Sequence, residues 1–244
     1  GLMRAVRKRG LCVQPFKVGP DFIDPSHHTA ITGRVSRNLD PFMMGEEGVK
    51  RPFLDAAKGA DSAIIEGVMG LYDGLDGSDA ASTAHVMRIL RAPAVLVVDV
   101  KGMSRSAHAV VRGFCSFDRD LDIRGVLFNR VGSERHRAMI EQYRSLPAFG
   151  FIPRDEGLAV ESRHLGLKMA FEVNESTSTP DIVGDSCDIA SIFAAAKSAP
   201  GLEGAPFSHD CPEERVRIGI AQDAAFCFYY QDNLDALRSA GAVL

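Results

Sequence analysis

The chain has 244 residues and a formal net charge of −4, from 28 lysines and arginines against 32 aspartates and glutamates. Hydrophobic residues make up 45% and charged residues 25% of it, which excludes wholesale disorder. The mild acidity argues against a nucleic-acid partner or a membrane surface, and no apolar run has the roughly 18–20 residues that span a bilayer. Five scattered cysteines without a C-x-x-C pair favour reduced thiols and a cytoplasmic protein.

Short apolar runs alternate along the chain with segments of helical period. Strands are predicted at the runs rich in β-branched residues: 13–18, 63–65, 94–98, 126–128 and 149–152. Helices are predicted over residues 1–9, about 79–91, 103–114 and a segment capped by Ser133. This alternation indicates an α/β fold with a mainly parallel sheet, and the uniformly apolar runs 63–65 and 94–98 predict strands buried on both faces.

The composition of the sequence changes after residue 171. A polar segment and a short Ala-rich helix at 188–197 precede residues 198–214, whose prolines and glycines are typical of an interdomain linker. A new strand is predicted at 216–221, a helix at 233–240 and the start of another strand at 242–244. We therefore expect one domain over 1–197, a linker over 198–214, and the beginning of a second α/β domain over 215–244.

Residues 17–25, K-V-G-P-D-F-I-D-P, follow the first predicted strand. They therefore lie at its carboxyl edge, where ligands bind in open α/β sheets. Lys17 can offer an ammonium group to a phosphate or carboxylate, and Asp21 and Asp24 add two carboxylates, although solvated charges in an ordinary turn have the same pattern. With the continuation as far as Pro41, this stretch has about 25 residues that are dense in polar groups and lack a strong period, which predicts a long irregular segment of the kind that is usually functional. The adjacent His27 and His28 fit hydrogen-bonding histidines better than zinc ligands.

Residues 66–77, E-G-V-M-G-L-Y-D-G-L-D-G, form a second motif directly after a predicted strand. Four glycines in twelve positions let a backbone approach a ligand closely. Glu66, at the tip of that strand, resembles the Walker-B position, from which a carboxylate reaches Mg²⁺ or its waters. A glycine-rich surface loop is the alternative, but a second acidic loop at the same sheet edge favours function.

Two further segments give weaker signals of a binding site, and several known catalytic motifs are missing from the sequence. Asn129 follows one predicted strand, and Pro153 and Arg154 follow another; an asparagine at such an edge can pair with a purine, but turns also use these residues. The sequence contains no G-x-x-x-x-G-K-[ST] phosphate loop, no G-x-S-x-G serine elbow and no G-x-C-x-G glutaminase nucleophile. A complete phosphate site is therefore not visible within these residues.

Taken together, the motifs closely resemble the cobyrinic acid a,c-diamide synthase family. The matching stretches are K-V-G-P-D-F-I-D-P-S-H-H, S-R-N-L-D, E-G-V-M-G-L-Y-D-G, V-V-D-V-K-G-M-S-R-S, N-R-V-G-S-E-R-H, P-R-D-E, R-H-L-G-L and R-I-G-I-A-Q-D-A-A-F-C-F-Y-Y-Q-D-N-L. The resemblance implies a doubly wound P-loop NTPase domain similar to dethiobiotin synthetase, followed by a class I glutamine amidotransferase-like domain. It places the phosphate-loop strand and turn before Gly1, and the glutaminase Cys and His after Leu244.

The resemblance also implies a reaction. ATP with Mg²⁺ phosphorylates the a and c carboxylates of cobyrinic acid, and nitrogen from glutamine or ammonia then displaces phosphate, in cobalamin biosynthesis. It assigns Mg²⁺ to Asp40 and Glu66, phosphate or carboxylate contact to Lys17, the catalytic loop to Asp21, Phe22, Ile23 and Asp73, adenine contacts to Asn129, Pro153 and Arg154, and substrate contacts to Asp24, Tyr72, Ser104 and Arg105.

Alternatives stay open at this point. Hydrogenobyrinic acid and nickel-sirohydrochlorin are also substrates within the family, and a partitioning-type nucleotide switch uses a similar sheet. The segments 17–25 and 66–74 favour the amidoligase over the switch. A homodimer is one assembly that the resemblance allows, and we expect the 244 residues without their phosphate loop to be nearly inactive alone.

Overall fold

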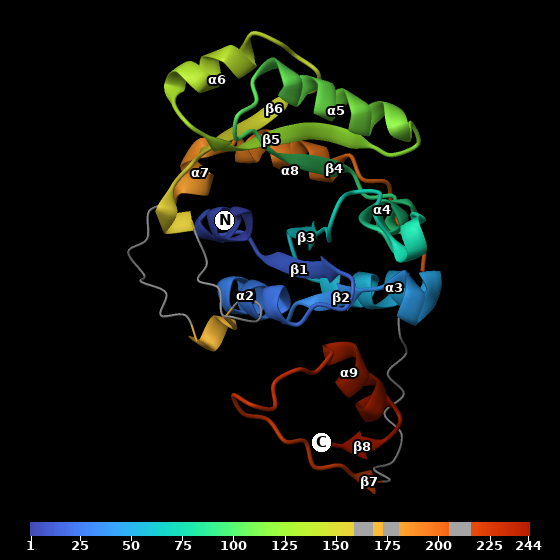
Figure 1. The fold of residues 1–244 in the computed structure, drawn as a ribbon. Helices are drawn as coiled ribbons and strands as arrows, with labels where there is room; N and C mark the ends of the chain where they lie inside the picture. Colours follow the sequence, from blue (N-terminus) through green and yellow to red (C-terminus); the bar gives the residue numbers. More distant parts are fainter. Residues whose placement is uncertain (159–167, 173–180, 205–215) are drawn as a thin grey trace.

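Two parallel sheets of three strands each form the centre of the structure, a computed structural model that describes residues 1–158, 168–172, 181–204 and 216–244 (Figure 1). The first sheet has the order β2-β1-β3 and the second β4-β5-β6. Their bounds are β1 Val13–Val18, β2 Arg37–Leu39, β3 Ser62–Glu66, β4 Ala94–Asp99, β5 Ile123–Val131 and β6 Ala148–Pro153. Every pairing in them is parallel, which confirms the predicted α/β class.

Helices cover both faces of the first sheet. Phe16 and Val18 of β1 point to one face and pack with Val49 of α3 (Pro41–Ala57) and with α4 (Thr83–Leu90). Val13 points to the other face and packs with α1 (Leu2–Lys8), while α2 (Ile23–Thr32) contacts both α1 and β1. All six residues of β1 are buried, as expected for the middle strand of a covered sheet.

The second sheet is covered in the same way. In Figure 1, α5 (Arg105–Phe117) and α6 (Glu134–Glu141) lie above it, and α7 (Ile182–Ser186) and α8 (Ile189–Lys197) lie below it. Ala107 and Val111 of α5 are fully buried against β4 and β5, whereas Val110 of the predicted apolar face is exposed. Three short 3-10 turns complete the described elements, at Leu75–Gly77, Glu156–Leu158 and Ala170–Glu172.

Helix α4 packs on both sheets. Val86, Ile89 and Leu90 join the core beneath β1. Ala84 and Met87 belong to another cluster, in which Leu121 and partly buried residues of β4 and β5 take part. One amphipathic helix thereby ties the two sheets together.

The strands at residues 63–65 and 94–98 were predicted to be buried on both faces. The structure does not bear this out, because both lie at the edge of a sheet. Within the described residues, β3 pairs only with β1, and β4 pairs only with β5, so each is an edge strand. Leu96 and Val98 pack toward α5, but Val97 on the opposite face is 64% exposed. The apolar runs thus identified the two strands correctly. They did not predict the burial of these strands, because burial depends on neighbouring strands and helices that a local run does not specify.

The prediction of a long irregular segment over residues 17–41 is wrong, since α2 and β2 lie within it. Helix α2 escapes a periodicity search because its interior side chains are polar: the Thr29 and Thr32 hydroxyls donate to carbonyl oxygens four residues earlier in the helix. The helix predicted over about 79–91 begins only at Thr83, because the side chain of Ser82 accepts the amide of His85 and caps it there. The helix over 188–197 is confirmed, with Asp188 as its cap.

The residues after 215 form a small unit in which β7 (Val216–Arg217) pairs in parallel with β8 (Ala242–Val243) and α9 (Gln231–Ser239) connects them. The strand predicted over 216–221 is therefore much shorter, because β8 offers it only two residues for pairing. Most of the predicted linker, residues 205–214, lies outside the described residues. In the described part of the chain, no helix combines the length and apolar character needed to cross a membrane.

Candidate functional site

Lys17 is the centre of a charged cluster at the carboxyl edge of the first sheet. The parallel register sets it between Asn38 of β2 and Glu66 of β3. Its Nζ lies 2.7 Å from Asp24 Oδ2 and 3.4 Å from Glu66 Oε1, and it donates to the Gly67 carbonyl oxygen at 3.0 Å. The side chain is only 6% exposed, so these oxygens replace its water.

His28 holds the other side of the Glu66 carboxylate. Its Nε2 lies 2.5 Å from Glu66 Oε2, and its Nδ1 lies 3.3 Å from the hydroxyl of Ser36. The helix α2 carries this buried histidine over the edge of the sheet. Glu66, itself 47% exposed, therefore has both oxygens engaged while its outer side faces solvent.

These contacts shift the pKa values within the cluster. Burial lowers the pKa of Lys17, but the hydrogen bond to Asp24 and the charges of Glu66 and Asp24 outweigh burial and raise it overall. Burial raises the pKa of Asp24 and of Glu66, yet Lys17 and His28 lower both below their ordinary values. Burial raises the pKa of Asp21, and its neighbour Asp24 adds to that shift. The cluster thus holds a cation beside two ionised carboxylates at neutral pH.

Hydrogen bonds to its backbone hold the loop over residues 19–22 in place. The Asn38 side-chain amide donates to the carbonyl oxygens of Gly19 at 2.8 Å and Asp21 at 2.7 Å. Gly19 adopts a positive φ of 80°, a conformation that other residues rarely take. Asp21 Oδ1 accepts the amide of Ile23 at 2.8 Å, where α2 begins. The predicted catalytic residues Asp21, Phe22 and Ile23 therefore sit directly beside Lys17 and Asp24.

Asp40 follows β2 at the same edge and is buried. Its Oδ1 accepts the amides of Phe42 and Met43, so it caps α3. Among the described residues, no group of three or more His, Cys, Asp or Glu side chains is arranged to hold a metal ion, so they form no cage made of protein alone. Mg²⁺ commonly takes one or two carboxylates together with phosphate oxygens and waters, and its assignment to Asp40 and Glu66 stays a prediction.

Tyr72 and Asp73 lie in the glycine-rich loop but make different contacts. The Tyr72 hydroxyl donates to the Phe114 carbonyl oxygen at 2.5 Å, and its ring stacks on Phe114, so it packs against α5 rather than joining the Lys17 cluster. Asp73 Oδ2 accepts the amide of Gly70 at 3.1 Å. A Cβ atom on Gly70 would lie 2.2 Å from that oxygen, so only glycine permits this arrangement.

The remaining predicted residues lie at the carboxyl edge of the second sheet. Asn129 stands near the end of β5, and its side-chain oxygen accepts the amide of Arg130. Pro153 ends β6, and the amide of Arg154 donates to the Val131 carbonyl oxygen. Ser104 precedes α5, and the Arg105 guanidinium lies 4.7 Å from the centre of the Tyr143 ring. The structure thus brings Lys17, Asp21, Asp24 and Glu66 together, whereas the other five lie in or after the elements of the second sheet.

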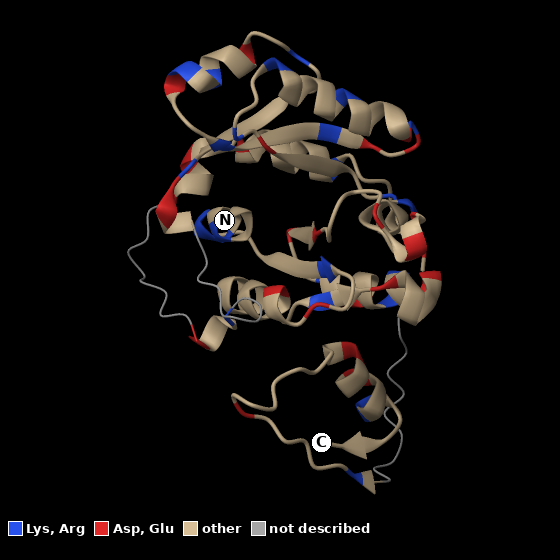
Figure 2. Cartoon of the chain, in the orientation of Figure 1, with Lys and Arg blue, Asp and Glu red and all other residues tan. Residues whose placement is uncertain are grey.

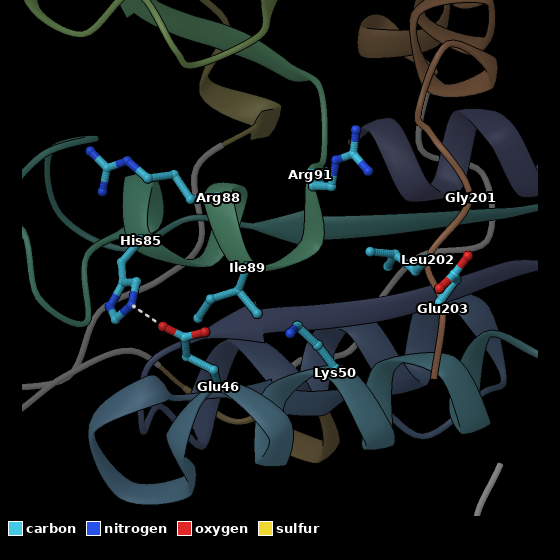
Figure 3. A pocket seen from close by; sticks show the side chains of 9 residues that line it. All are labelled: Glu46, Lys50, His85, Arg88, Ile89, Arg91, Gly201, Leu202 and Glu203. Carbon is cyan, nitrogen blue, oxygen red and sulfur yellow. Dashed lines mark ion pairs between the residues drawn. The ribbon is translucent and has the colours of Figure 1, made fainter. Parts of the chain in front are cut away.

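A cavity of about 590 Å³ lies away from every predicted site residue (Figure 3). It opens between α3, α4 and residues 201–203 and carries charges of both signs from Glu46, Lys50, Arg88, Arg91 and Glu203. Arg88 is committed to ion pairs with Asp79 and Asp118. The cavity therefore lacks the convergent chemistry of the Lys17 cluster.

Two contributors to the cluster, His28 and Asn38, were given no role in the site by the sequence analysis. His28 was named only as a hydrogen-bonding residue and not as the partner of Glu66, which lies 38 positions away. Asn38 was part of the S-R-N-L-D match but had no role. A polar residue that directly precedes a strand end, as Asn38 does, is the signal that could have indicated the clamp on the loop.

Comparison with known proteins gives a consistent result. Residues 1–167 match the sequence model of the CobQ/CobB/MinD/ParA nucleotide binding domain. A cobyrinate a,c-diamide synthase of Listeria monocytogenes is 44% identical over 255 residues, covering 100% of this chain and 56% of the relative. The protein of that name in Methanosarcina acetivorans is 43% identical over 265 residues (99% and 53%), and that of Archaeoglobus fulgidus is 44% identical over 248 residues (97% and 54%).

The chain spans about half the length of the curated relatives it matches. The similarity includes the residues after 215, which lie beyond the region of the domain match. The described site and the domain match agree, since the charged cluster lies at the sheet edge where such domains bind their ligands. The chain belongs to the CobQ/CobB/MinD/ParA nucleotide binding domain family, and within it resembles the cobyrinate a,c-diamide synthases along its whole length.

Proposed function

We propose that this chain is part of an enzyme that uses ATP to amidate the a and c carboxylates of cobyrinic acid in cobalamin biosynthesis. The nitrogen comes from glutamine or ammonia, and an acyl phosphate is the intermediate. The observation that carries this proposal is the buried Lys17 between Asp24 and Glu66, next to the fixed loop over 19–22. The names of the relatives support the choice of reaction.

The chemistry explains why such a cluster suits this reaction. A carboxylate oxygen is a poor leaving group, so phosphorylation must precede attack by ammonia. The protein contributes by orienting the carboxylate and the phosphate and by neutralising their charge. We assign charge neutralisation to Lys17 and orientation of the substrate to Asp21, Phe22, Ile23 and Asp73. Asp24 holds Lys17 in place.

ATP and Mg²⁺ complete the proposal. Mg²⁺ supplies positive charge to the phosphate oxygens, and Asp40 and Glu66 are the residues we assign to it. We assign the adenine to Asn129, Pro153 and Arg154, and substrate contacts to Ser104 and Arg105, at the edge of the second sheet. The substrate contact assigned to Tyr72, whose hydroxyl donates to the Phe114 carbonyl oxygen, stays a prediction.

The domain organisation is also part of the proposal. We infer an ATP-binding domain over residues 1–197, a linker over 198–214 and the start of an amidotransferase-like domain over 215–244. The small β7-β8-α9 unit, whose strands pair with each other, supports this division. In the full-length protein, we place the phosphate-loop strand between β3 and β4, whose facing edges have no partner among the described residues.

An assay of the full-length protein tests the function. Purified protein with ATP, Mg²⁺ and glutamine is supplied in turn with cobyrinic acid, hydrogenobyrinic acid and nickel-sirohydrochlorin, and mass spectrometry counts the amides added. We expect two amides on cobyrinic acid. Preference for another ring would correct the substrate, and ATP hydrolysis without amidation of any ring would favour a nucleotide switch.

A further inference from the structure

An aromatic stack joins the residues after 215 to the loop beside Lys17. The Phe22 ring is stacked on Tyr230, with centroids 4.3 Å apart and planes at 26°. It is also stacked on Phe228, at 5.1 Å and 14°. Phe22 belongs to the proposed catalytic loop, whereas Phe228 and Tyr230 precede α9. Stacked aromatic pairs stabilise a contact beyond the apolar area that they bury.

A hydrogen bond links the same two segments. The Tyr230 hydroxyl donates to the Pro20 carbonyl oxygen at 2.9 Å. Asn38 already holds the carbonyl oxygens of Gly19 and Asp21, on either side of Pro20. Three consecutive carbonyl groups of the loop are therefore fixed, two from the first sheet and the middle one from the residues after 215.

An ion-pair cluster supports this contact on the neighbouring strand. The Arg37 guanidinium, in β2, binds Asp232 through one nitrogen and lies 2.7 Å from Asp235 Oδ2 through the other. All three side chains are at most 32% exposed. In Figure 2, acidic residues of α9 lie on the side of the helix toward the first sheet. Because Arg37 directly precedes Asn38, the same short strand carries both the loop clamp and the docking point.

We propose that Tyr230 and Phe228 are positioning residues for the synthetase site: docking of the segment before α9 holds the loop over 19–22 in the conformation that presents Asp21 to the substrate. The inference rests on the proposed function and deepens it, because it makes the competence of the first domain depend on the start of the second. Neither side chain contacts the reacting groups; both act through Phe22 and Pro20.

The test uses the full-length protein with ammonia as nitrogen source, so that glutamine hydrolysis plays no part. Tyr230→Ala removes both the stack and the hydrogen bond, and a misplaced loop is expected to lower kcat about tenfold to a hundredfold. Tyr230→Phe keeps the stack and should recover most of that loss. The KM for ATP should not change, because the proposed adenine contacts lie on the other sheet. Hydrogen exchange of the amides in residues 19–23 should become faster in Tyr230→Ala.

Tyr229 provides a matched control in the adjacent position. Its hydroxyl donates to the Ala221 carbonyl oxygen within its own unit, at 2.6 Å. Tyr229→Ala should leave the exchange of residues 19–23 unchanged and kcat within about twofold of wild type. Equal effects of the two alanine variants, or unchanged kcat and exchange in Tyr230→Ala, would overturn the inference. Faster exchange with unchanged kcat would also overturn it, because the loop would then move without consequence for the reaction.

The two proposals can fail separately. If the wild-type protein amidates no ring, the proposed function is wrong. The exchange experiment still decides the docking contact in that case, since it needs no substrate. Faster exchange in Tyr230→Ala alone supports the contact, and unchanged exchange rules it out.

Discussion

Lys17 keeps its charge inside the protein because carboxylates replace the water it loses on burial. Asp24 lies at 2.7 Å and Glu66 at 3.4 Å, and His28 fixes Glu66 from the opposite side. Removing one partner of a buried ion pair leaves the charge of the other uncompensated. This lowers the free energy of unfolding far more than losing a surface pair does. The cluster is therefore sensitive to any change in its protonation.

Acid should weaken this cluster. The pKa values of Asp24 and Glu66 are below their ordinary values of 3.8 and 4.5, so the folded protein binds protons less readily than the unfolded chain. Their stabilisation is complete above those ordinary values and is lost as the pH falls through the lower folded values. We expect Glu66→Gln to lower the free energy of unfolding near neutral pH, and the difference from wild type to shrink as the pH falls below 4.5, the ordinary pKa of the Glu66 carboxyl.

Urea unfolding of the full-length protein over this pH range measures the effect. Glu47→Gln is the control, because Glu47 is 68% exposed and forms a surface pair with Lys50. That substitution should change stability little at any pH. A constant difference between Glu66→Gln and wild type at all pH values would contradict the prediction.

Asp73→Asn tests the glycine-rich loop. An asparagine oxygen can still accept the amide of Gly70, so the loop keeps its fold while the charge is lost. We expect amidation by the full-length protein to slow about 100-fold or more, as when an orienting group is removed. Asp76→Asn is the control, because asparagine tolerates the positive φ of 52° at that position. Double amidation at the wild-type rate would show that Asp73 has no catalytic role.

For single residues, the motifs predicted which charged side chains come together, but not the long-range contacts that those side chains make. Lys17, Asp21, Asp24 and Glu66 meet as expected, because parallel strands bring their carboxyl ends to one edge. The pairing of Glu66 with His28, or of Tyr230 with Pro20, spans 38 and 210 positions. Contacts over such distances depend on how α2 and the C-terminal unit pack, and no local pattern encodes that packing.

Among the elements, α4 shows how a cap sets a helix boundary. Ser82 is fully buried, and its hydroxyl accepts the amide of His85 at 3.1 Å. Ser133 caps α6 in the same manner, but at an exposed position. Since α4 packs on both sheets, shortening it disturbs two cores at once.

The two caps make a matched comparison. Ser82→Ala should lower the free energy of unfolding by about 2 kcal/mol, because the His85 amide then has no acceptor in a buried turn. Ser133→Ala should cost only about 0.5–1 kcal/mol, because water replaces the lost oxygen. Urea unfolding of both variants tests the difference, and equal losses would show that burial of the cap does not matter.

Strands and capped helices were predictable because each has a local signature. The five strands predicted before residue 171 all occur, and Ser133 caps the helix that it was expected to cap. Helix α2 and the three-residue strand β2 lack such a signature, since one has a polar interior and the other is too short to show a period. Helix α3 was not predicted either. It is interrupted by Gly45, at a φ of 68°, and contains Pro52, and both residues are typical of a helix end rather than of a helix interior.

For the whole molecule, the class was predictable but the division into sheets was not. Alternating strands and helices give parallel pairing, whereas strand order depends on which crossover follows each strand. Arg37, Phe22 and Pro20 join the first sheet to the unit after residue 215 through side chains of opposite charge and stacked rings. Contacts between segments this far apart in the chain are not encoded by any one motif.

The edges of β3 and β4 that have no partner strand among the described residues have a consequence for handling the protein. An unpaired strand edge with an apolar residue such as Val97, 64% exposed, is a template for pairing with another chain. A preparation in which nothing covers these edges will tend to aggregate as its concentration rises, and charged or proline substitutions on β4 are the natural remedy. The same property makes this pair of edges a place where a separately supplied strand could complement the fold in trans.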